Sequence, residues 1–216
     1  MILFDLDGTL IDSAPAIHAS VNHLLADLGS EPLAMTQVKS FVGNGIVVLT
    51  QRVIAARGLA QPLDDLVAHL LQHYDTDADA LTTLYPGVPQ ALQALHGAGH
   101  RMGICSNKPE GPARHILSHF GLDGLFGTII GGDTVGVTKP DPAPLLAAKA
   151  ALGGGPAVFV GDSEVDAETA VRAGMPFILF TEGYRKSPLA ELPHQATFSD
   201  FAELPGIAAR LLADQA

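Results

Sequence analysis

The strongest constraint on the fold is a regular alternation of apolar and amphipathic segments from Tyr85 to the end of the chain, with Gly or Pro between them. The apolar runs predict strands at 102–105, 128–130, 157–160, 176–180 and 196–198. The segments between them predict helices at about 88–98, 109–119, 142–152, 164–173 and 200–212. A chain in which strands and helices alternate forms a parallel sheet with helices on both faces. We therefore predict an α/β fold with a doubly wound, Rossmann-like parallel sheet.

The part of the chain before Tyr85 has a different pattern. Residues 1–4 are apolar and predict the first strand of the sheet, whereas no convincing strand appears between about 15 and 83. Ser13 can cap a helix that ends near Gly29, and two further helical patterns cover about 45–57 and 63–81. We therefore expect residues 1–14 and 84–216 to form the Rossmann-like core, and residues 15–83 to form an all-helical cap inserted into it.

Composition narrows the class of protein. The 216 residues are 47% hydrophobic, so the chain can bury a core. The formal net charge of -11 argues against nucleic acid or an anionic membrane as a partner, because both bind clustered Lys and Arg. One cysteine excludes an internal disulfide. The apolar start meets an acid at Asp5 and no run of about 20 apolar residues follows, so we expect no signal peptide and no membrane span, and predict a cytoplasmic protein.

Polar side chains collect where three predicted strands end. They are Asp5 and Asp7 after the first strand, Ser106 and Asn107 after the strand at 102–105, and Asp162 and Asp166 after the strand at 157–160. The carboxyl ends of parallel strands meet at one edge of a sheet, and Lys139, in the loop before a helix, can bring a cation there. Four aspartates do not stay ionised near one another without a hard cation. Oxygen ligands of this kind suit Mg²⁺, which also binds substrate phosphate.

These residue types can carry out phosphoryl transfer. Asp5 can attack phosphorus and form an aspartyl phosphate, while Asp7 protonates the leaving oxygen and later activates water. Lys139 and Mg²⁺ would neutralise the phosphoryl oxygens, and Ser106 would donate a hydrogen bond to one of them. The pattern therefore predicts a hydrolase that acts on phosphate esters.

Four segments around the helical insertion, DLDGT, SNK, TKP and GDSEVD, resemble in this order the four motifs of the haloacid dehalogenase superfamily of phosphatases. Within it the chain is most similar to the phosphoglycolate phosphatases, through DLDGTLIDSAPAI and the FVGNG turn at 41–45. The resemblance implies Mg²⁺-dependent conversion of 2-phosphoglycolate to glycolate and phosphate, with Asp5 as the nucleophile and Asp7 as the acid and base. It implies that the side chains of Asp5 and Asp162 and the backbone carbonyl of Asp7 hold the metal. Asp166 would orient the metal's waters or Lys139. Thr9 and Asn107 would lie at the edge of the phosphate pocket.

The cap should supply any contact to an anionic group beyond the phosphate. One candidate is Arg52, and the other is the turn formed by Gly43, Asn44 and Gly45, whose backbone N–H groups at a helix start can hold an anion. Arg52 is equally explained as an ordinary solvated helix residue. A cap that lies over the site excludes bulk water, which favours a small phosphorylated substrate over a macromolecule.

Other functions stay open at this point. A sugar phosphomutase shares every core motif, and a pyrophosphatase, nucleotidase or sugar phosphatase is hard to exclude. From a different class, a phospho-receiver module also combines acids, Ser or Thr, Lys and Mg²⁺, although it lacks a helical insertion. A catalytically silent binding module would carry the same motifs. No pattern in the sequence indicates the oligomeric state.

Cysteine and histidine supply two further candidates. Cys105 lies in an apolar run with no evident partner base, so we interpret it as a buried strand residue. Two histidine pairs with i,i+4 spacing could bind a metal on predicted helices. They are His69 with His73, and His115 with His119. Neither pair has a third ligand in the sequence pattern, and we expect surface or half-buried histidines.

Overall fold

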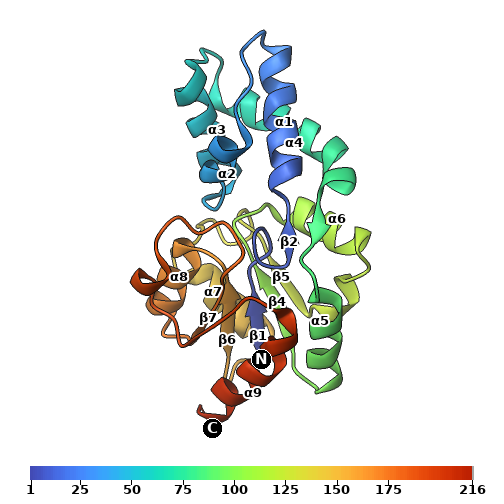
Figure 1. Cartoon of the computed structure of the whole chain (residues 1–216), viewed down its shortest axis with the longest axis vertical. Coiled ribbons are helices and arrows are strands. Elements are labelled where there is room, and N and C mark those ends of the chain that lie inside the picture. The colour runs from blue at the N-terminus through green and yellow to red at the C-terminus, as the bar shows by residue number, and fades with distance from the viewer. Residues whose placement is uncertain (216) are drawn as a thin grey trace.

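A sheet of six parallel strands forms the centre of the computed structural model, which describes residues 1–215 apart from the side chains of Asp75 and Asp77 (Figure 1). The strands are β1 (Ile2–Phe4), β4 (Met102–Cys105), β5 (Thr128–Ile130), β6 (Val158–Gly161), β7 (Phe177–Phe180) and β8 (Ala196–Phe198). Their order is β5-β4-β1-β6-β7-β8. The chain starts in the middle of the sheet and winds first to one edge and then to the other, which confirms the doubly wound topology.

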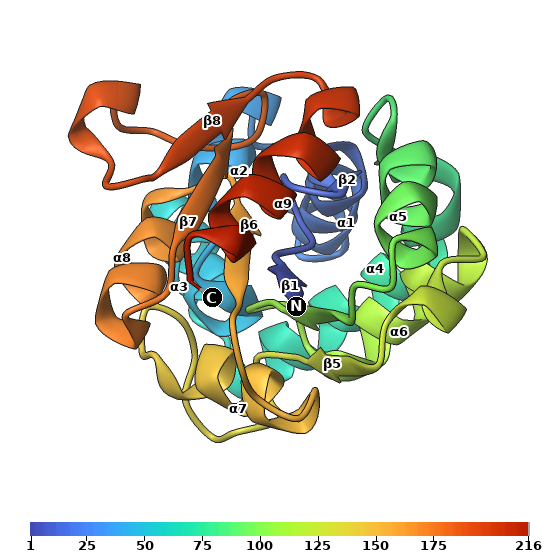
Figure 2. The same ribbon diagram turned by 90° about the horizontal axis from the view of Figure 1, so that it is seen from below.

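Helices cover both faces of the sheet (Figure 2). The helices α5 (Val88–Gly97), α6 (Glu110–His119) and α9 (Leu204–Ala213) pack on one face, and α7 (Ala143–Ala151) and α8 (Glu164–Ala173) pack on the other. Alternate residues of a strand point to opposite faces. In β1, Ile2 and Phe4 accordingly join the first core cluster and Leu3 joins the second. The all-apolar pattern of this strand is therefore explained by burial on both sides.

Four helices form a cap above the carboxyl ends of the central strands (Figure 1). They are α1 (Ala14–Asp27), α2 (Met35–Phe41), α3 (Gly45–Arg57) and α4 (Leu63–Leu81). The helices expected at 45–57 and 63–81 are confirmed. The finer division, with the core at 1–14 and 84–216 and the cap at 15–83, stays a prediction. Among residues 1–215, no helix is long and apolar enough to cross a membrane.

One helix and one pair of short strands in or beside the cap were not expected from the sequence. Helix α2 has only seven residues, and Val38 is its one buried residue, so it lacks an apolar stripe. The strands β2 (Ile11–Asp12) and β3 (Thr83–Leu84) pair in antiparallel fashion where the chain enters and leaves the cap. Strand β3 begins at Thr83, at the very end of the range in which no strand was expected. Strands of two residues are too short to show the alternation that identifies a strand.

The start of α1 also differs from expectation. The Ser13 side chain does not cap this helix. Its Oγ instead donates to Asp7 Oδ1 at 2.6 Å. The backbone N–H groups of Ser13 and Ala14 donate to the hydroxyl of Tyr184, at 2.8 and 2.9 Å. The Tyr184 hydroxyl, 171 positions after Ser13, therefore accepts hydrogen bonds from backbone N–H groups at the start of α1. The Ser13 hydroxyl is left to contact Asp7.

Candidate active site

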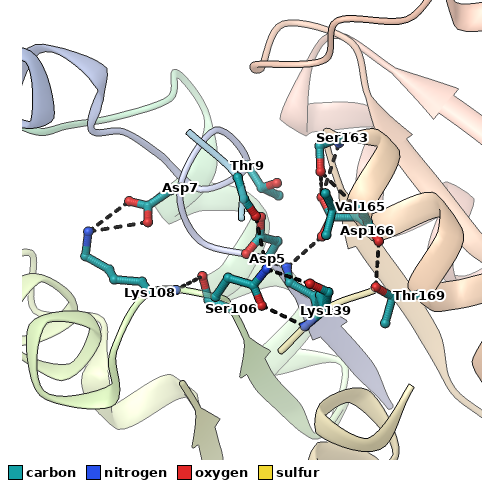
Figure 3. A network of polar contacts seen from close by, with 12 residues as sticks. Asp5, Asp7, Thr9, Ser106, Lys108, Lys139, Ser163, Val165, Asp166 and Thr169 are labelled. Atoms are coloured by element: carbon teal, nitrogen blue, oxygen red, sulfur yellow. Dashed lines mark hydrogen bonds and ion pairs between the residues drawn. The ribbon is translucent and has the colours of Figure 1, made fainter. Parts of the chain in front are cut away.

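Three strands in register bring the predicted site residues to one edge of the sheet. Phe4 of β1 is level with Ile104 of β4 and with Val160 of β6. The chain therefore leaves these strands at the same height, directly below the cap (Figure 1). Figure 3 shows the polar side chains that meet there.

A buried ion cluster lies at the centre of this edge. The Lys139 ammonium is 2.8 Å from Asp5 Oδ1 and 2.6 Å from Asp166 Oδ1. Carboxylate oxygens of Asp5, Asp162 and Asp166 all lie within 4.8 Å of one another, and all three residues are buried. Three buried carboxylates thus lie together with one lysine, which contacts Asp5 and Asp166, and the cluster is short of positive charge.

The pKa shifts in the cluster reflect the same excess of buried negative charge over positive charge. Burial, with the Asp166 carboxylate as the next cause, raises the pKa of Asp5 to about 6, although Lys139 opposes the shift. Burial and the neighbouring carboxylates raise the pKa of Asp162 well above its ordinary value. Burial alone would lower the pKa of Lys139, but Asp166 and Asp5 outweigh it and raise that pKa. A group of buried oxygen donors that lacks positive charge fits Mg²⁺.

Hydrogen bonds fix the orientation of Asp162 and Asp166. Asp162 Oδ1 accepts from Thr9 Oγ1 at 2.9 Å, and Oδ2 accepts from the Tyr184 N–H at 2.5 Å. Asp166 Oδ2 accepts from the backbone N–H and the hydroxyl of Ser163. The backbone N–H of Asp166 donates to Ser163 Oγ, which completes a capping box at the start of α8. The Thr9 hydroxyl, expected at the edge of the phosphate pocket, therefore contacts a carboxylate instead. Its role in this structure is to hold Asp162.

The turn after Asp7 leaves no space for a side chain beside this cluster. Gly8 has φ +87°, and a Cβ atom there would lie 2.6 Å from Asp162 Oδ2. We expect Gly8→Ala to destabilise the protein by about 2 kcal/mol or more and to reduce activity, because Asp162 must move. Thermal denaturation and turnover measure the two effects.

Gly58→Ala is the matched control for this prediction. Gly58 also has positive φ, +64°, but nothing lies within 4 Å of its Cβ position. This variant should lose about 1 kcal/mol of stability and keep full activity. Equal loss of activity in both variants would contradict the role assigned to the Gly8 turn.

A second ion pair holds Asp7. The Lys108 ammonium lies 3.1 Å from Asp7 Oδ1 (Figure 3). It also donates to the hydroxyl of Tyr74 on α4 at 2.6 Å. Burial alone would lower the pKa of Lys108, but Asp7 and Tyr74 outweigh it and raise the pKa, so the amine is charged. Sequence reasoning did not assign a role to Lys108 or Tyr74. Only the i,i+4 spacing of Tyr74 after Leu66 and Leu70 signals that it is buried.

Ser106 and Asn107 lie between the core and the cap. Asn107 Nδ2 donates to the backbone carbonyls of Gly43 at 3.0 Å and Lys139 at 2.9 Å, and Asn107 Oδ1 accepts from the Lys139 N–H. Asn107 thus holds the lysine loop and the cap turn in place. Ser106 is buried beside it and lines the same cavity.

A cavity of about 80 Å³ separates the cap from these residues. That volume accommodates roughly half a dozen water-sized groups, which suits a small ligand. Its polar floor is formed by Asp5, Asp7, Ser106, Asn107 and Lys108, and most of the remaining lining is apolar, including Ile17, Val42, Ile46, Leu49 and Leu70.

Only some of the cap residues that were expected to bind substrate line the cavity, as far as the structure describes it. Gly43 and Gly45 line the cavity, whereas Asn44 and Arg52 are not among the described lining residues. The Arg52 guanidinium donates to the Phe41 carbonyl at 2.7 Å and to Asn44 Oδ1 at 2.8 Å. Arg52 therefore supports the glycine turn instead of facing a ligand. The position of Arg52 in the sequence does not indicate that acceptors at Phe41 and Asn44 bind its guanidinium.

Cys105 agrees with its interpretation as a strand residue. It is fully buried in β4, and burial raises the pKa of its thiol to about 12. A thiol with that pKa is protonated at neutral pH and is a poor nucleophile.

The fold and the site together define a Rossmann-like α/β enzyme with a helical cap, an aspartate nucleophile candidate at the end of β1 and a candidate magnesium centre. Residues 2–180 match the family model for haloacid dehalogenase-like hydrolases, and the chain belongs to this family.

Relatives of known name are similar over nearly the whole chain. A phosphoglycolate phosphatase of Cereibacter sphaeroides is 52% identical, with 98% of this chain and 99% of the relative covered. A phosphoglycolate phosphatase of Rhodobacter capsulatus is 47% identical, with 95% of each chain covered. Among solved structures, one described as a predicted phosphoglycolate phosphatase from Haemophilus somnus 129PT superimposes with a TM-score of 0.90 at 33% identity and 96% coverage of each chain.

Proposed function

We propose that this phosphoric monoester hydrolase converts 2-phosphoglycolate to glycolate and phosphate through an aspartyl-phosphate on Asp5, with Mg²⁺ as cofactor. The observation that carries the proposal is the placement of Asp5 between the buried Lys139 cluster and the floor of a small cavity. The relatives named above support the substrate. Cytoplasmic location stays a prediction.

The first half of the reaction transfers the phosphoryl group to the protein. An Asp5 oxygen attacks phosphorus, the bond from phosphorus to the ester oxygen breaks, and Asp7, in the protonated form that the second half of the cycle regenerates, gives its proton to that oxygen. Ser13 Oγ and Lys108 Nζ both contact Asp7 and hold its carboxyl group in position for this proton transfer. Ser106 faces the same cavity and can donate to a phosphoryl oxygen.

The second half releases phosphate. Asp7, now a carboxylate, takes a proton from a water molecule that attacks phosphorus, and the bond to Asp5 breaks. Lys139 stays charged beside Asp5 throughout and offsets negative charge on the phosphoryl oxygens. Asp5, Asp162 and the Asp7 carbonyl would hold Mg²⁺, which supplies further positive charge to those oxygens when it is bound.

Lys108 is the side chain that fits the carboxylate of the substrate. Among the described residues that line the cavity, it carries the one positive charge. The apolar side chains that form most of the rest of the cavity lining cannot bind a carboxylate, and a buried charge-assisted hydrogen bond is among the stronger polar contacts. We therefore assign recognition of the leaving group to Lys108, in place of Arg52.

Lys108→Met should change substrate preference. We expect kcat/KM for 2-phosphoglycolate to fall about tenfold or more relative to kcat/KM for ethyl phosphate, which lacks the carboxylate. The substitution also affects Asp7, but that effect is common to both substrates. Taking the ratio of the two kcat/KM values cancels it. Tyr74→Phe keeps the ammonium and is the control, with little change in the ratio. An unchanged ratio in Lys108→Met would contradict this assignment.

A panel of substrates tests the proposed function as a whole. Phosphate release is measured with Mg²⁺ and with a chelator for 2-phosphoglycolate, sugar phosphates, nucleoside monophosphates and pyrophosphate. We expect 2-phosphoglycolate to have the highest kcat/KM and the chelator to abolish turnover. A higher value for another phosphate would overturn the substrate, and full activity in chelator would overturn the role of Mg²⁺.

A further inference from the structure

A second group of potential metal ligands lies on the cap, where α1 packs against α4. His69 and His73 occupy successive turns of α4 and so share one helix face. Their Nε2 atoms lie 3.0 and 2.8 Å from one and the same atom, Oδ2 of Asp27 at the end of α1. The two imidazole rings stack with centroids 5.0 Å apart. Three donor atoms from two helices thus converge on one point.

The geometry is close to that of a metal site. The three ligand atoms lie within 4.8 Å of one another. A tetrahedral Zn²⁺ ion places its ligand atoms roughly 3.4 Å apart, so the Asp27 contacts would widen by a few tenths of an ångström. The side chains of His69, His73 and Asp27 are 35, 24 and 49% exposed, so they have room to move that far.

We propose that Asp27, His69 and His73 form a binding site for a divalent transition-metal ion of the zinc type, separate from the magnesium centre. Two imidazole nitrogens and one carboxylate favour Zn²⁺ over Mg²⁺, whereas the cluster around Asp5 offers oxygen atoms alone. His23 lies one turn before Asp27 on α1, and its ring centroid is 5.5 Å from that of His73. His23 does not belong to the converging group of ligand atoms, and a bound ion would tie α1 to α4 through Asp27, His69 and His73.

The other histidine pair shows that i,i+4 spacing alone does not create such a site. His115 Nε2 lies 2.8 Å from Asp79 Oδ1, whereas His119 Nδ1 lies 3.6 Å from Asp79 Oδ2. Different oxygens of Asp79 are contacted, and among the described residues this trio does not form a converging group of ligand atoms. It therefore provides a matched control on the same protein.

The competing interpretation is a simple ion pair. Hydrogen bonding from His73 is the main cause that lowers the pKa of Asp27, which favours the carboxylate form of Asp27. Protons and a metal ion compete for the same nitrogens. Zn²⁺ binding at a pH of about 7.5, where free histidine is mostly neutral, separates the two.

The test is a Zn²⁺ titration of the full-length protein by calorimetry in excess Mg²⁺, which keeps the oxygen cluster filled. We expect one Zn²⁺ per chain in the wild type, at least tenfold weaker binding in His69→Gln and in His73→Gln, and unchanged binding in His115→Gln. Co²⁺ in place of Zn²⁺ should give visible absorption bands that His73→Gln abolishes.

A second readout guards against adventitious binding. Zn²⁺ at 100 times its Kd should raise the Tm of the wild type and of His115→Gln by about 5–10 °C, with no such rise in His73→Gln. Absence of Zn²⁺ binding by the wild type would overturn the proposal, and so would equal binding by the wild type and His73→Gln. These outcomes do not depend on the substrate or on catalysis, so the proposed function stands or falls separately.

Discussion

Asp5→Asn is expected to abolish hydrolysis of 2-phosphoglycolate, with kcat lowered by about 10⁴-fold or more. An amide of the same shape cannot form the acyl-phosphate bond, so the change removes the nucleophile and leaves the cavity intact. The raised pKa of Asp5 shows that its charge is unfavourable in the fold, mainly because the group is buried and lies near Asp166. The variant should therefore be as stable as the wild type or more so.

Phosphate release and thermal denaturation, measured on the same samples, check this prediction. Asp123→Asn, in the exposed turn after α6, is the control and should keep full activity. A kcat of Asp5→Asn within tenfold of the wild type would show that another group attacks phosphorus. A large fall in Tm would instead attribute the loss of activity to unfolding.

Lys139→Met is expected to lower both stability and activity. The Lys139 ammonium contacts Asp5 at 2.8 Å and Asp166 at 2.6 Å, and its side chain is only 2% exposed. Removing one partner of a buried ion pair costs about 3–5 kcal/mol, because the remaining charges stay buried without compensation. The reaction also loses the ammonium beside the phosphoryl oxygens, so kcat should fall by about 10²-fold or more.

The pH dependence distinguishes this effect from simple loss of packing. Burial already raises the pKa of Asp5 in the folded wild type, and Lys139 opposes that shift. Without Lys139 the folded-state pKa of Asp5 rises further, so the folded variant binds this proton more tightly. Because the pKa of Asp5 in the folded wild type is about 6, the stability deficit of the variant relative to the wild type is smaller at low pH and grows as the pH rises above about 6. Urea denaturation of the variant and the wild type at several pH values measures this difference.

Lys149→Met on α7 is the control, because it removes a half-buried lysine that is not part of the cluster. It should show little deficit at any pH. A deficit of Lys139→Met that does not change with pH would contradict the electrostatic role of this lysine.

Much of the fold could be predicted because its elements bury long, periodic apolar patterns. Helices at 45–57 and 63–81 and strands such as β4 and β5 match their expected bounds. The short elements could not be predicted. Helix α2 buries one residue, and each strand of the β2–β3 pair has two residues, so neither carries a period. Both exist because of tertiary contacts and not because of a local pattern.

The candidate site was predictable where strand ends position it. The carboxyl-edge rule brings Asp5, Asp162 and Lys139 together. The structure places the Lys139 ammonium 2.8 Å from Asp5 Oδ1, and carboxylate oxygens of Asp5 and Asp162 within 4.8 Å of each other. Contacts that depend on the cap or on distant loops were not predictable. Lys108 contacts Tyr74, which lies 34 positions earlier in the sequence. No sequence pattern predicts that these two side chains lie close together.

The same limit applies to Tyr184 and to the histidines of the cap. Tyr184 reaches Ser13 across 171 positions and Asp162 across 22. The i,i+4 spacing of His69 and His73 was visible in the sequence, but Asp27 comes from another helix, 42 positions before His69. The packing of α1 against α4 brings Asp27 to His69 and His73, and the sequence alone does not show that packing.

The central claim, covalent catalysis by Asp5, is tested most directly by trapping the intermediate. The protein is mixed with 2-phosphoglycolate and Mg²⁺, quenched within milliseconds, and digested for peptide mass spectrometry. We predict that one phosphoryl group is added, that it maps to Asp5, and that no adduct forms in Asp5→Asn. A phosphoryl group on another residue, or a burst of free phosphate with no adduct at any quench time, would contradict the mechanism.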